Sequence, residues 1–182
     1  MKEITFNNNN LTDTEIDKVV KKVRAVIFND RIGKILIVNY AGLYMLPGGK
    51  IDNNETEMSA LKREIIEESG IEITELELEP YLVINSYDKN YHTREYGTIN
   101  RLTQTTFYVI HTDKEIDISK KKLTKSEIEK NHTITYEYLE VIEYLIRINN
   151  SFNPKRKQFD REILTALYEC PTFKNKRKIL TK

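Results

Sequence analysis

Three glutamates within residues 49–71 have the chemistry and spacing of a metal site. This stretch, GKIDNNETEMSALKREIIEESGI, holds five glutamates and one aspartate. Glu64 and Glu68 are four residues apart and Glu67 lies between them, so a helix would place the three carboxylates side by side. Oxygen ligands of this kind suit Mg²⁺ or Mn²⁺, which often bind substrate phosphates at the same time. The cluster predicts a divalent-metal site, and a solvated helix face is the alternative.

The repulsion among these carboxylates must be offset by a positive charge. Like charges at this spacing cost about 0.2–0.5 kcal/mol per pair in an isolated helix. Arg63, next to the cluster, can neutralise one carboxylate, and a bound cation could neutralise two or three. The preceding turn at Gly48 and Gly49 allows the backbone to approach closely and can offer a carbonyl to the same ion.

The helix that must carry the cluster is predicted from its apolar stripe. Met58, Leu61 and Ile65 recur at intervals of three and four residues, as on one face of a helix. At about 100° per residue, Glu64 lies roughly 90° around the helix from this stripe, so the acidic cluster borders the core-facing side. Gly70 stands where a left-handed residue would end the helix.

The other elements predict an α+β domain, in which a mixed sheet has helices packed on its faces. Runs rich in β-branched residues at 22–28 and 34–40, separated by NDRIG, predict a hairpin. A short extended piece at 42–49 follows. Two strands are expected at 75–87 and 102–112, joined by a polar loop at 88–100. Residues 113–135 are expected to be mostly loop, and helices are expected at 136–150 and 159–170.

Composition narrows the class of protein. The chain has 182 residues, of which 39% are hydrophobic and 31% charged, and a net charge of +1 gives no reason to expect a nucleic acid or an anionic membrane as partner. With one cysteine and no apolar run long enough to span a membrane, the expected location is the cytoplasm. The expected organisation is an N-terminal extension at 1–21, a domain at 22–150, and a C-terminal helix with a basic tail at 151–182.

The whole stretch at 49–71 resembles the Nudix box, the signature GX5EX7REUXEEXGU in which U is a bulky aliphatic residue. Gly49, Glu55, Arg63-Glu64-Ile65, Glu67-Glu68 and Gly70-Ile71 fill every fixed position. The resemblance implies the Nudix fold, with a mixed β-sheet between helices, and a hydrolase acting on nucleoside diphosphates linked to another moiety. In this family, metal ions hold the pyrophosphate while an activated water attacks phosphorus.

The resemblance also implies roles for individual residues. Metal ligands would be Glu64, Glu67, Glu68 and the Gly49 carbonyl, and Arg63 would orient a neighbouring carboxylate. The general base varies in the family between a box glutamate, such as Glu64 or Glu67, and one from a later loop. A match to that later loop makes Glu127 the candidate here, with Glu129 second. The expected cofactor is Mg²⁺, with Mn²⁺ as a substitute.

The sequence signals for residues that bind the substrate are less specific than those for the metal site. Tyr87 lies sixteen positions after Ile71, where a tyrosine is associated with diadenosine polyphosphate hydrolases. Tyr91 and Arg94, in the loop at 88–100, could stack a base and hold a phosphate. The three histidines, His92, His111 and His132, lack metal-ligand spacing and are expected to be structural or at the surface.

Two other functions stay open beside hydrolysis of a small nucleotide. One is a nucleotide-binding regulatory domain without turnover, although no carboxylate of the box is missing. The other is an RNA 5′-pyrophosphohydrolase, for which the basic patches at 154–157 and 174–178 would contact RNA; without interleaved aromatic residues, a solvated surface is the better interpretation. A homodimer is compatible with the resemblance, but no interface is identifiable from the sequence.

Overall fold

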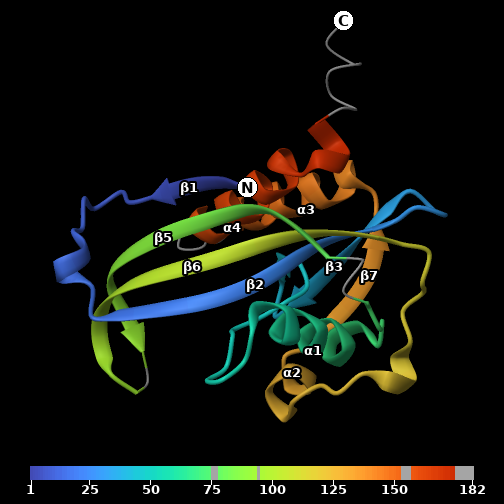
Figure 1. Cartoon of the computed structure of the whole chain (residues 1–182), viewed down its shortest axis with the longest axis horizontal. Helices are drawn as coiled ribbons and strands as arrows, with labels where there is room; N and C mark the ends of the chain where they lie inside the picture. Colours follow the sequence, from blue (N-terminus) through green and yellow to red (C-terminus); the bar gives the residue numbers. More distant parts are fainter. Residues whose placement is uncertain (75–77, 94, 153–156, 175–182) are drawn as a thin grey trace, which may run out of the picture.

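A mixed β-sheet with helices on both faces forms the centre of the molecule (Figure 1). The structure, a computed structural model, describes residues 1–74, 78–93, 95–152 and 157–174, without the side chains of residues 126, 127, 149–152 and 157. Helix α1 (Glu57–Ser69) packs on one face, and α3 (Leu139–Phe152) and α4 (Lys157–Glu169) pack on the other. The predicted α+β class, with a sheet between helices, is confirmed.

The sheet combines parallel and antiparallel neighbours. Its order is β1-β5-β6-β2-β3-β4, and β7 also pairs with β3. The β1–β5 and β2–β6 pairs are parallel, and the other pairs are antiparallel. The strands are β1 (Lys2–Phe6), β2 (Lys18–Asn29), β3 (Lys34–Tyr40), β4 (Leu43–Met45), β5 (Glu79–Thr93), β6 (Gly97–Thr112) and β7 (Thr133–Glu137). Two 3₁₀ turns, η1 (Asp13–Glu15) and η3 (Ile118–Lys120), and the short helix α2 (Lys125–Glu129) lie between them.

Strand β2 runs through the middle of the core and is buried on both faces. Val23 and Ile27 contribute to the apolar cluster beneath α1, whereas Val26 and Phe28 contribute to the cluster beneath α3 and α4. This alternation follows from the two-residue period of a strand. The predicted hairpin is confirmed, because β2 and β3 are antiparallel and Phe28 pairs with Ile35.

Residues 88–100 were expected to form a loop, and this expectation is wrong for most of them. Strand β5 continues to Thr93 and β6 begins at Gly97, with His92 paired to Thr98. The ladder shifts register between Asp88 and Tyr91. This part of the hairpin is largely exposed, so its polar side chains show no apolar alternation from which a strand could be predicted.

Two further boundaries differ from expectation because of strand pairing. The helix predicted at 136–150 begins at Leu139, because residues 133–137 form β7 on the edge of β3. Within the expected extension at 1–21, residues 2–6 form β1 parallel to β5, and β2 begins at Lys18. The C-terminal helix α4 packs on the sheet through Ile163, Ala166 and Leu167. No helix within the described ranges is long and apolar enough to cross a membrane.

Candidate active site

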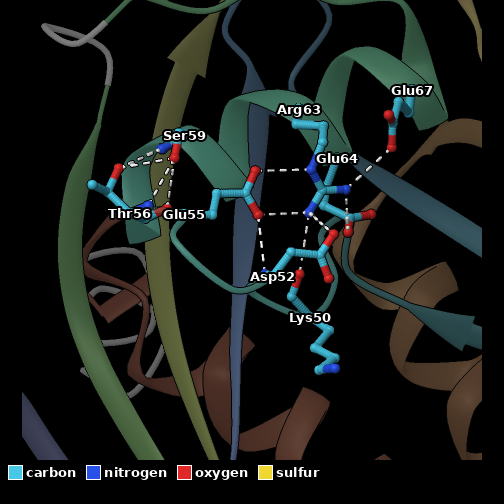
Figure 2. A network of polar contacts seen from close by, with 8 residues as sticks. All are labelled: Lys50, Asp52, Glu55, Thr56, Ser59, Arg63, Glu64 and Glu67. Atoms are coloured by element: carbon cyan, nitrogen blue, oxygen red, sulfur yellow. Dashed lines mark hydrogen bonds and ion pairs between the residues drawn. The ribbon is translucent and has the colours of Figure 1, made fainter.

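Local sequence signals at both ends fix helix α1. Thr56 caps the N-terminus, where its hydroxyl oxygen accepts a hydrogen bond from the Ser59 N–H at 3.1 Å and the Ser59 side chain bonds back to the Thr56 N–H (Figure 2). Gly70 ends the helix with a φ of 71°. A side chain at Gly70 would collide with the Asp117 carbonyl, which lies 2.0 Å from the position of a Cβ. The glutamates between these two caps therefore have a fixed register.

Arg63 is the centre of a polar network that joins the helix to the preceding loop (Figure 2). Its Nε and Nη2 donate to the two oxygens of Glu55, each at 2.9 Å, and Nη2 also donates to the Lys50 carbonyl at 3.2 Å. Nη1 donates to Glu64 at 2.9 Å and to Glu67 at 3.2 Å. The hydrogen bonds with Glu55 raise the pKa of Arg63, and Arg63 lowers the pKa of Glu55. One guanidinium thus offsets the charge of three carboxylates.

Glu64 lies directly against the glycine turn. A Cβ on Gly49 would lie 2.3 Å from Glu64 Oε1, so any side chain at this position would displace the carboxylate. Burial raises the pKa of Glu64, and the hydrogen bond from Arg63 acts in the opposite direction. The Gly49 carbonyl accepts the Val23 N–H at 3.0 Å and keeps a second lone pair for another contact.

The three glutamates predicted as metal ligands differ in how deeply their side chains are buried. The exposed fraction of the side chain falls from 36% for Glu67 to 17% for Glu64 and 8% for Glu68. Glu68 is anchored by the Gly48 N–H, which donates to Oε2 at 3.0 Å. Gly48 has a φ of 125°, and a side chain there would overlap the backbone of β2. The structure therefore brings Glu64 and Glu68 to the Gly48–Gly49 turn, and Glu67 is joined to Glu64 through Arg63.

The cluster is not yet arranged around one metal position. Within the described residues, no three His, Cys, Asp or Glu side chains are grouped so that they could hold an ion. Of Glu64 and Glu67, Arg63 contacts only one oxygen each, Oε1 of Glu64 and Oε2 of Glu67. The second oxygen of each carboxylate is therefore outside the Arg63 network.

A cavity of about 230 Å³ lies between the carboxylates and β3. It is lined by Val38, Tyr40, Met45, Gly48, Gly49, Glu64, Glu68 and His132. The side chain of His132 is only 1% exposed, so of the two expected places, structural or at the surface, the surface is wrong for this histidine. Among the described residues, neither ring nitrogen has a hydrogen-bond partner, and leaving a buried polar group unpaired costs about 1–3 kcal/mol. No sequence spacing indicates this residue, because only the fold brings it to Glu68.

The structure describes the side chain of only one of the two glutamates predicted from the later loop, Glu127 and Glu129. Glu127 lies in α2, but its side chain falls outside the described part of the structure. Glu129, at the end of α2, is exposed. The role of either residue as ligand or base therefore stays a prediction.

A second cavity, of about 310 Å³, lies on the other face of the sheet, beneath the start of α4. Its lining includes Lys22, Leu43, Asp88, Tyr91, Arg101, Thr103, Gln158, Phe159 and Glu162. Tyr91 stacks on Arg101, whose guanidinium carbon is 3.3 Å from the ring centroid. Burial lowers the pKa of Lys22 to about 8 and raises the pKa of Glu162. The cavity combines aromatic walls with charged and amide groups.

Arg24 lies between the two cavities. It is 7% exposed, its guanidinium carbon is 5.7 Å from the centroid of Phe159, and its Nη1 donates to the Leu46 carbonyl just before the glycine turn. Burial lowers its pKa, and the carboxylates of Glu68 and Glu162, one lining each cavity, act in the opposite direction. Arg24 therefore interacts with residues of both cavities.

The other predicted substrate residues lie elsewhere. Tyr87 and Ser86 are neighbours in β5, so their side chains lie on opposite faces of the strand. The Tyr87 hydroxyl donates to Asp13 at 2.9 Å. Arg94 lies outside the described residues. His92 and His111 are exposed, as expected. Of the three predicted substrate residues, only Tyr91 is placed at a cavity.

Comparison with known proteins assigns the family. A model described as NUDIX domain matches residues 19–165. The CTP pyrophosphohydrolase of Escherichia coli (strain K12) is 41% identical over 63 residues, which are 31% of this chain and 45% of that protein. The 8-oxo-dGTP diphosphatase of Proteus vulgaris is 33% identical over 69 residues, which are 35% of this chain and 62% of that protein. The similarity thus spans less than two thirds of either relative.

Comparison with solved structures points to the same family of folds. A NUDIX hydrolase from Nitrosomonas europaea superposes with a TM-score of 0.51 at 18% identity, covering 83% of this chain and 89% of that one. Such low identity establishes a common fold rather than a common substrate. The family model includes both the glycine turn and the whole of α1. Because it covers most of the sequence, the chain belongs to the NUDIX domain family.

Proposed function

We propose that this protein is a metal-dependent hydrolase that cleaves a phosphoanhydride bond of a nucleotide by attack of water at phosphorus. The observation that carries the proposal is the face of α1 on which Glu64 and Glu68 meet the Gly48–Gly49 turn at a cavity, with Glu67 joined to Glu64 through Arg63. Relatives named as a pyrophosphohydrolase and a diphosphatase support the reaction class.

The residues at this turn fit a divalent ion. Gly49 leaves the space that a Cβ would fill, and the Glu64 carboxylate occupies the edge of that space. Together with Glu68 and the Gly49 carbonyl, it forms an all-oxygen donor set suited to Mg²⁺ or Mn²⁺. When bound, such an ion would neutralise phosphate charge and lower the pKa of the attacking water. Arg63 would keep the unbound carboxylates in place by offsetting their repulsion.

Candidates for the general base are Glu64, Glu67 and Glu127. A base must reach the attacking water within hydrogen-bonding distance. Glu64 lines the cavity, whereas Glu67 is the more exposed of the two and is joined to Glu64 through Arg63. Glu127 would act only if α2 brings its carboxylate to the same space. The Gly48 N–H fixes Glu68, so this residue serves best as a ligand.

The nucleoside half of the substrate is proposed to occupy the second cavity. Tyr91 and Phe159 would contact a base, and the charged groups around Lys22 and Glu162 would bind its polar edge. The relatives act, by their names, on CTP and 8-oxo-dGTP, which makes a nucleoside triphosphate the first substrate class to test. No observation favours RNA, because the basic patches fall largely outside the described residues. The proposed location is the cytoplasm, which would keep the buried thiol of Cys170 reduced.

The test is a panel of nucleotides with Mg²⁺ or Mn²⁺ in H₂¹⁸O, with products identified by mass. At least one nucleotide should be hydrolysed with one ¹⁸O incorporated into a phosphate product. Glu68→Gln should lose about 100-fold or more of this activity with unchanged circular dichroism, whereas the exposed control Glu79→Gln should behave as wild type. If no nucleotide is turned over, or if Glu68→Gln stays fully active, the proposal is wrong.

A further inference from the structure

The imidazole of His132 is a buried group without a partner at the edge of the carboxylate cavity. Its side chain is 1% exposed, and neither Nδ1 nor Nε2 makes a hydrogen bond within the described part of the chain. Buried polar groups in folded proteins almost always have a partner. Because this ring borders a cavity rather than packed side chains, its partner is expected to be something that enters the cavity.

The position of Glu68 indicates what that partner is. His132 Nε2 lies 3.6 Å from Glu68 Oε1, which is too far for a hydrogen bond. The other oxygen of Glu68 is held by the Gly48 N–H at 3.0 Å. The carboxylate is therefore anchored through Oε2, while Oε1 and the imidazole nitrogen face each other without direct bonding. A cation in contact with both atoms would satisfy the two groups at once.

The backbone on both sides of His132 holds the ring in this position. On the N-terminal side, the Lys130 carbonyl accepts the Ala41 N–H at 3.1 Å, and Lys130 Nζ contacts the Tyr40 hydroxyl at 2.8 Å. On the C-terminal side, Thr133 starts β7 and pairs with Asn39 of β3. His132 thus lies in a short turn whose two ends are tied to β3 and to the residue that follows it, as a preorganised ligand requires.

We propose that His132 binds the divalent ion directly through Nε2, on the same ion as Glu68. The inference rests on the proposed function only in that both place a cation at this cavity. A neutral imidazole is a ligand for first-row transition ions, whereas Mg²⁺ strongly prefers oxygen. The site would therefore bind Mn²⁺ or a later transition ion more tightly than its carboxylates alone predict, and His132 would contribute to that selectivity.

Pulsed electron paramagnetic resonance on the Mn²⁺-loaded wild-type protein tests the bond without any variant. Electron spin echo modulation should contain the signature of a directly bound nitrogen, and it should change when the protein is made with ¹⁵N-histidine. The chain has three histidines, so a His92→Gln/His111→Gln variant, altered only at exposed rings, should keep the signal. If nitrogen modulation is missing in the wild type, or is insensitive to ¹⁵N-histidine, His132 is not a ligand.

Titration calorimetry on His132→Gln provides an independent readout. The Kd for Mn²⁺ should rise about 10-fold or more, while the Kd for Mg²⁺ should change by less than about threefold. His111→Gln is the matched control and should change neither. An equal loss for both ions would indicate that His132 only supports the shape of the cavity, and unchanged Mn²⁺ binding would exclude it as a ligand. Either result overturns the inference.

The two proposals fail in different experiments. Nucleotide turnover by the wild type tests the hydrolase function and does not depend on which atom binds the ion. The ¹⁵N-sensitive modulation tests His132 and does not depend on turnover. A protein that hydrolyses nucleotides but lacks nitrogen coupling would refute only the ligand, whereas coupling without any turnover would refute only the hydrolase.

Discussion

Gly49 and Glu64 fit together so closely that the glycine has no room for a side chain. A Cβ built on Gly49 would lie 2.3–2.6 Å from all three atoms of the Glu64 carboxyl group. Gly49 is not among the glycines with positive φ, so its backbone conformation is open to any residue. The requirement for glycine here is therefore steric and concerns the position of one carboxylate.

Gly49→Ala should consequently reduce activity without a backbone penalty. The added methyl group must push the Glu64 carboxylate away from the turn, and a displacement of about 1 Å at a reacting centre can cost on the order of 100-fold in rate. We expect kcat to fall by about 100-fold and Mn²⁺ to bind more weakly, as measured by nucleotide turnover and calorimetry.

Gly33→Ala is the control for this variant. Gly33 has a φ of 67° and nothing within 4 Å of a Cβ, so alanine there should cost about 1–2 kcal/mol of stability and leave kcat unchanged. If Gly49→Ala lowers the melting temperature but keeps full activity, the close fit between Gly49 and Glu64 is not needed for catalysis.

Arg63→Lys should reduce activity more than Glu55→Gln. A lysine cannot reproduce the fork that bonds both oxygens of Glu55 and still reach Glu64 and Glu67. Losing contacts that orient metal ligands typically costs 10- to 100-fold, so we expect kcat to fall by about that factor. Glu55→Gln should cost less than about 10-fold, because Arg63 keeps its contacts with both other carboxylates. Similar kcat values for the two variants would show that Arg63 acts only through the loop.

Local signals made part of this site predictable. Thr56 and Gly70 define the ends of α1 within the sequence itself, and the spacing of the glutamates then determines which ones share a face. Arg63 was expected to neutralise one carboxylate, but it contacts three, because the loop before the helix folds back and brings Glu55 to the guanidinium. That return depends on the tertiary path of the loop, which no helical spacing describes.

Features made by long-range pairing could not be predicted in the same way. His132 reaches Glu68 only because β7 pairs with β3, and a strand at 133–137 was not expected from the charged segment that contains it. The residues of β5 and β6 between Asp88 and Asn100 were expected to form a loop, since they are largely polar and exposed and show no apolar alternation. Both errors concern edges of the sheet, where side chains carry little information about pairing.

Tyr91→Ala should raise KM and leave kcat nearly unchanged. Tyr91 lines the second cavity and stacks on Arg101, so its removal opens the wall against which a base would lie. Stacking of a base on an aromatic ring is worth about 1–3 kcal/mol, and we expect KM to rise about 10-fold. Tyr87→Phe is the control, because the Tyr87 hydroxyl bonds to Asp13 on the other face of β5. If Tyr87→Phe raises KM and Tyr91→Ala does not, the nucleoside does not bind in this cavity.

Lys22 should give the stability of the protein a specific dependence on pH. Burial lowers its pKa to about 8 from an ordinary value of 10.5; Arg24 and Arg101 add to this effect, and Glu162 and Asp88 oppose it. Between these two values the unfolded chain binds more protons than the folded one, so stability rises with pH across this window. The burial penalty is fully present below about pH 8 and is lost as the pH approaches 10.5.

Lys22→Met removes this titration and tests its sign. At pH 7 the variant should be more stable than the wild type by up to about 3 kcal/mol, the free energy equivalent of the difference between the two pKa values. The advantage should shrink steadily between pH 8 and pH 10.5, as measured by urea unfolding at each pH. Lys89→Met, at an exposed position in β5, should show no such trend. A stability difference that is constant with pH would mean that Lys22 is solvated, and that the second cavity is open enough for water to reach it.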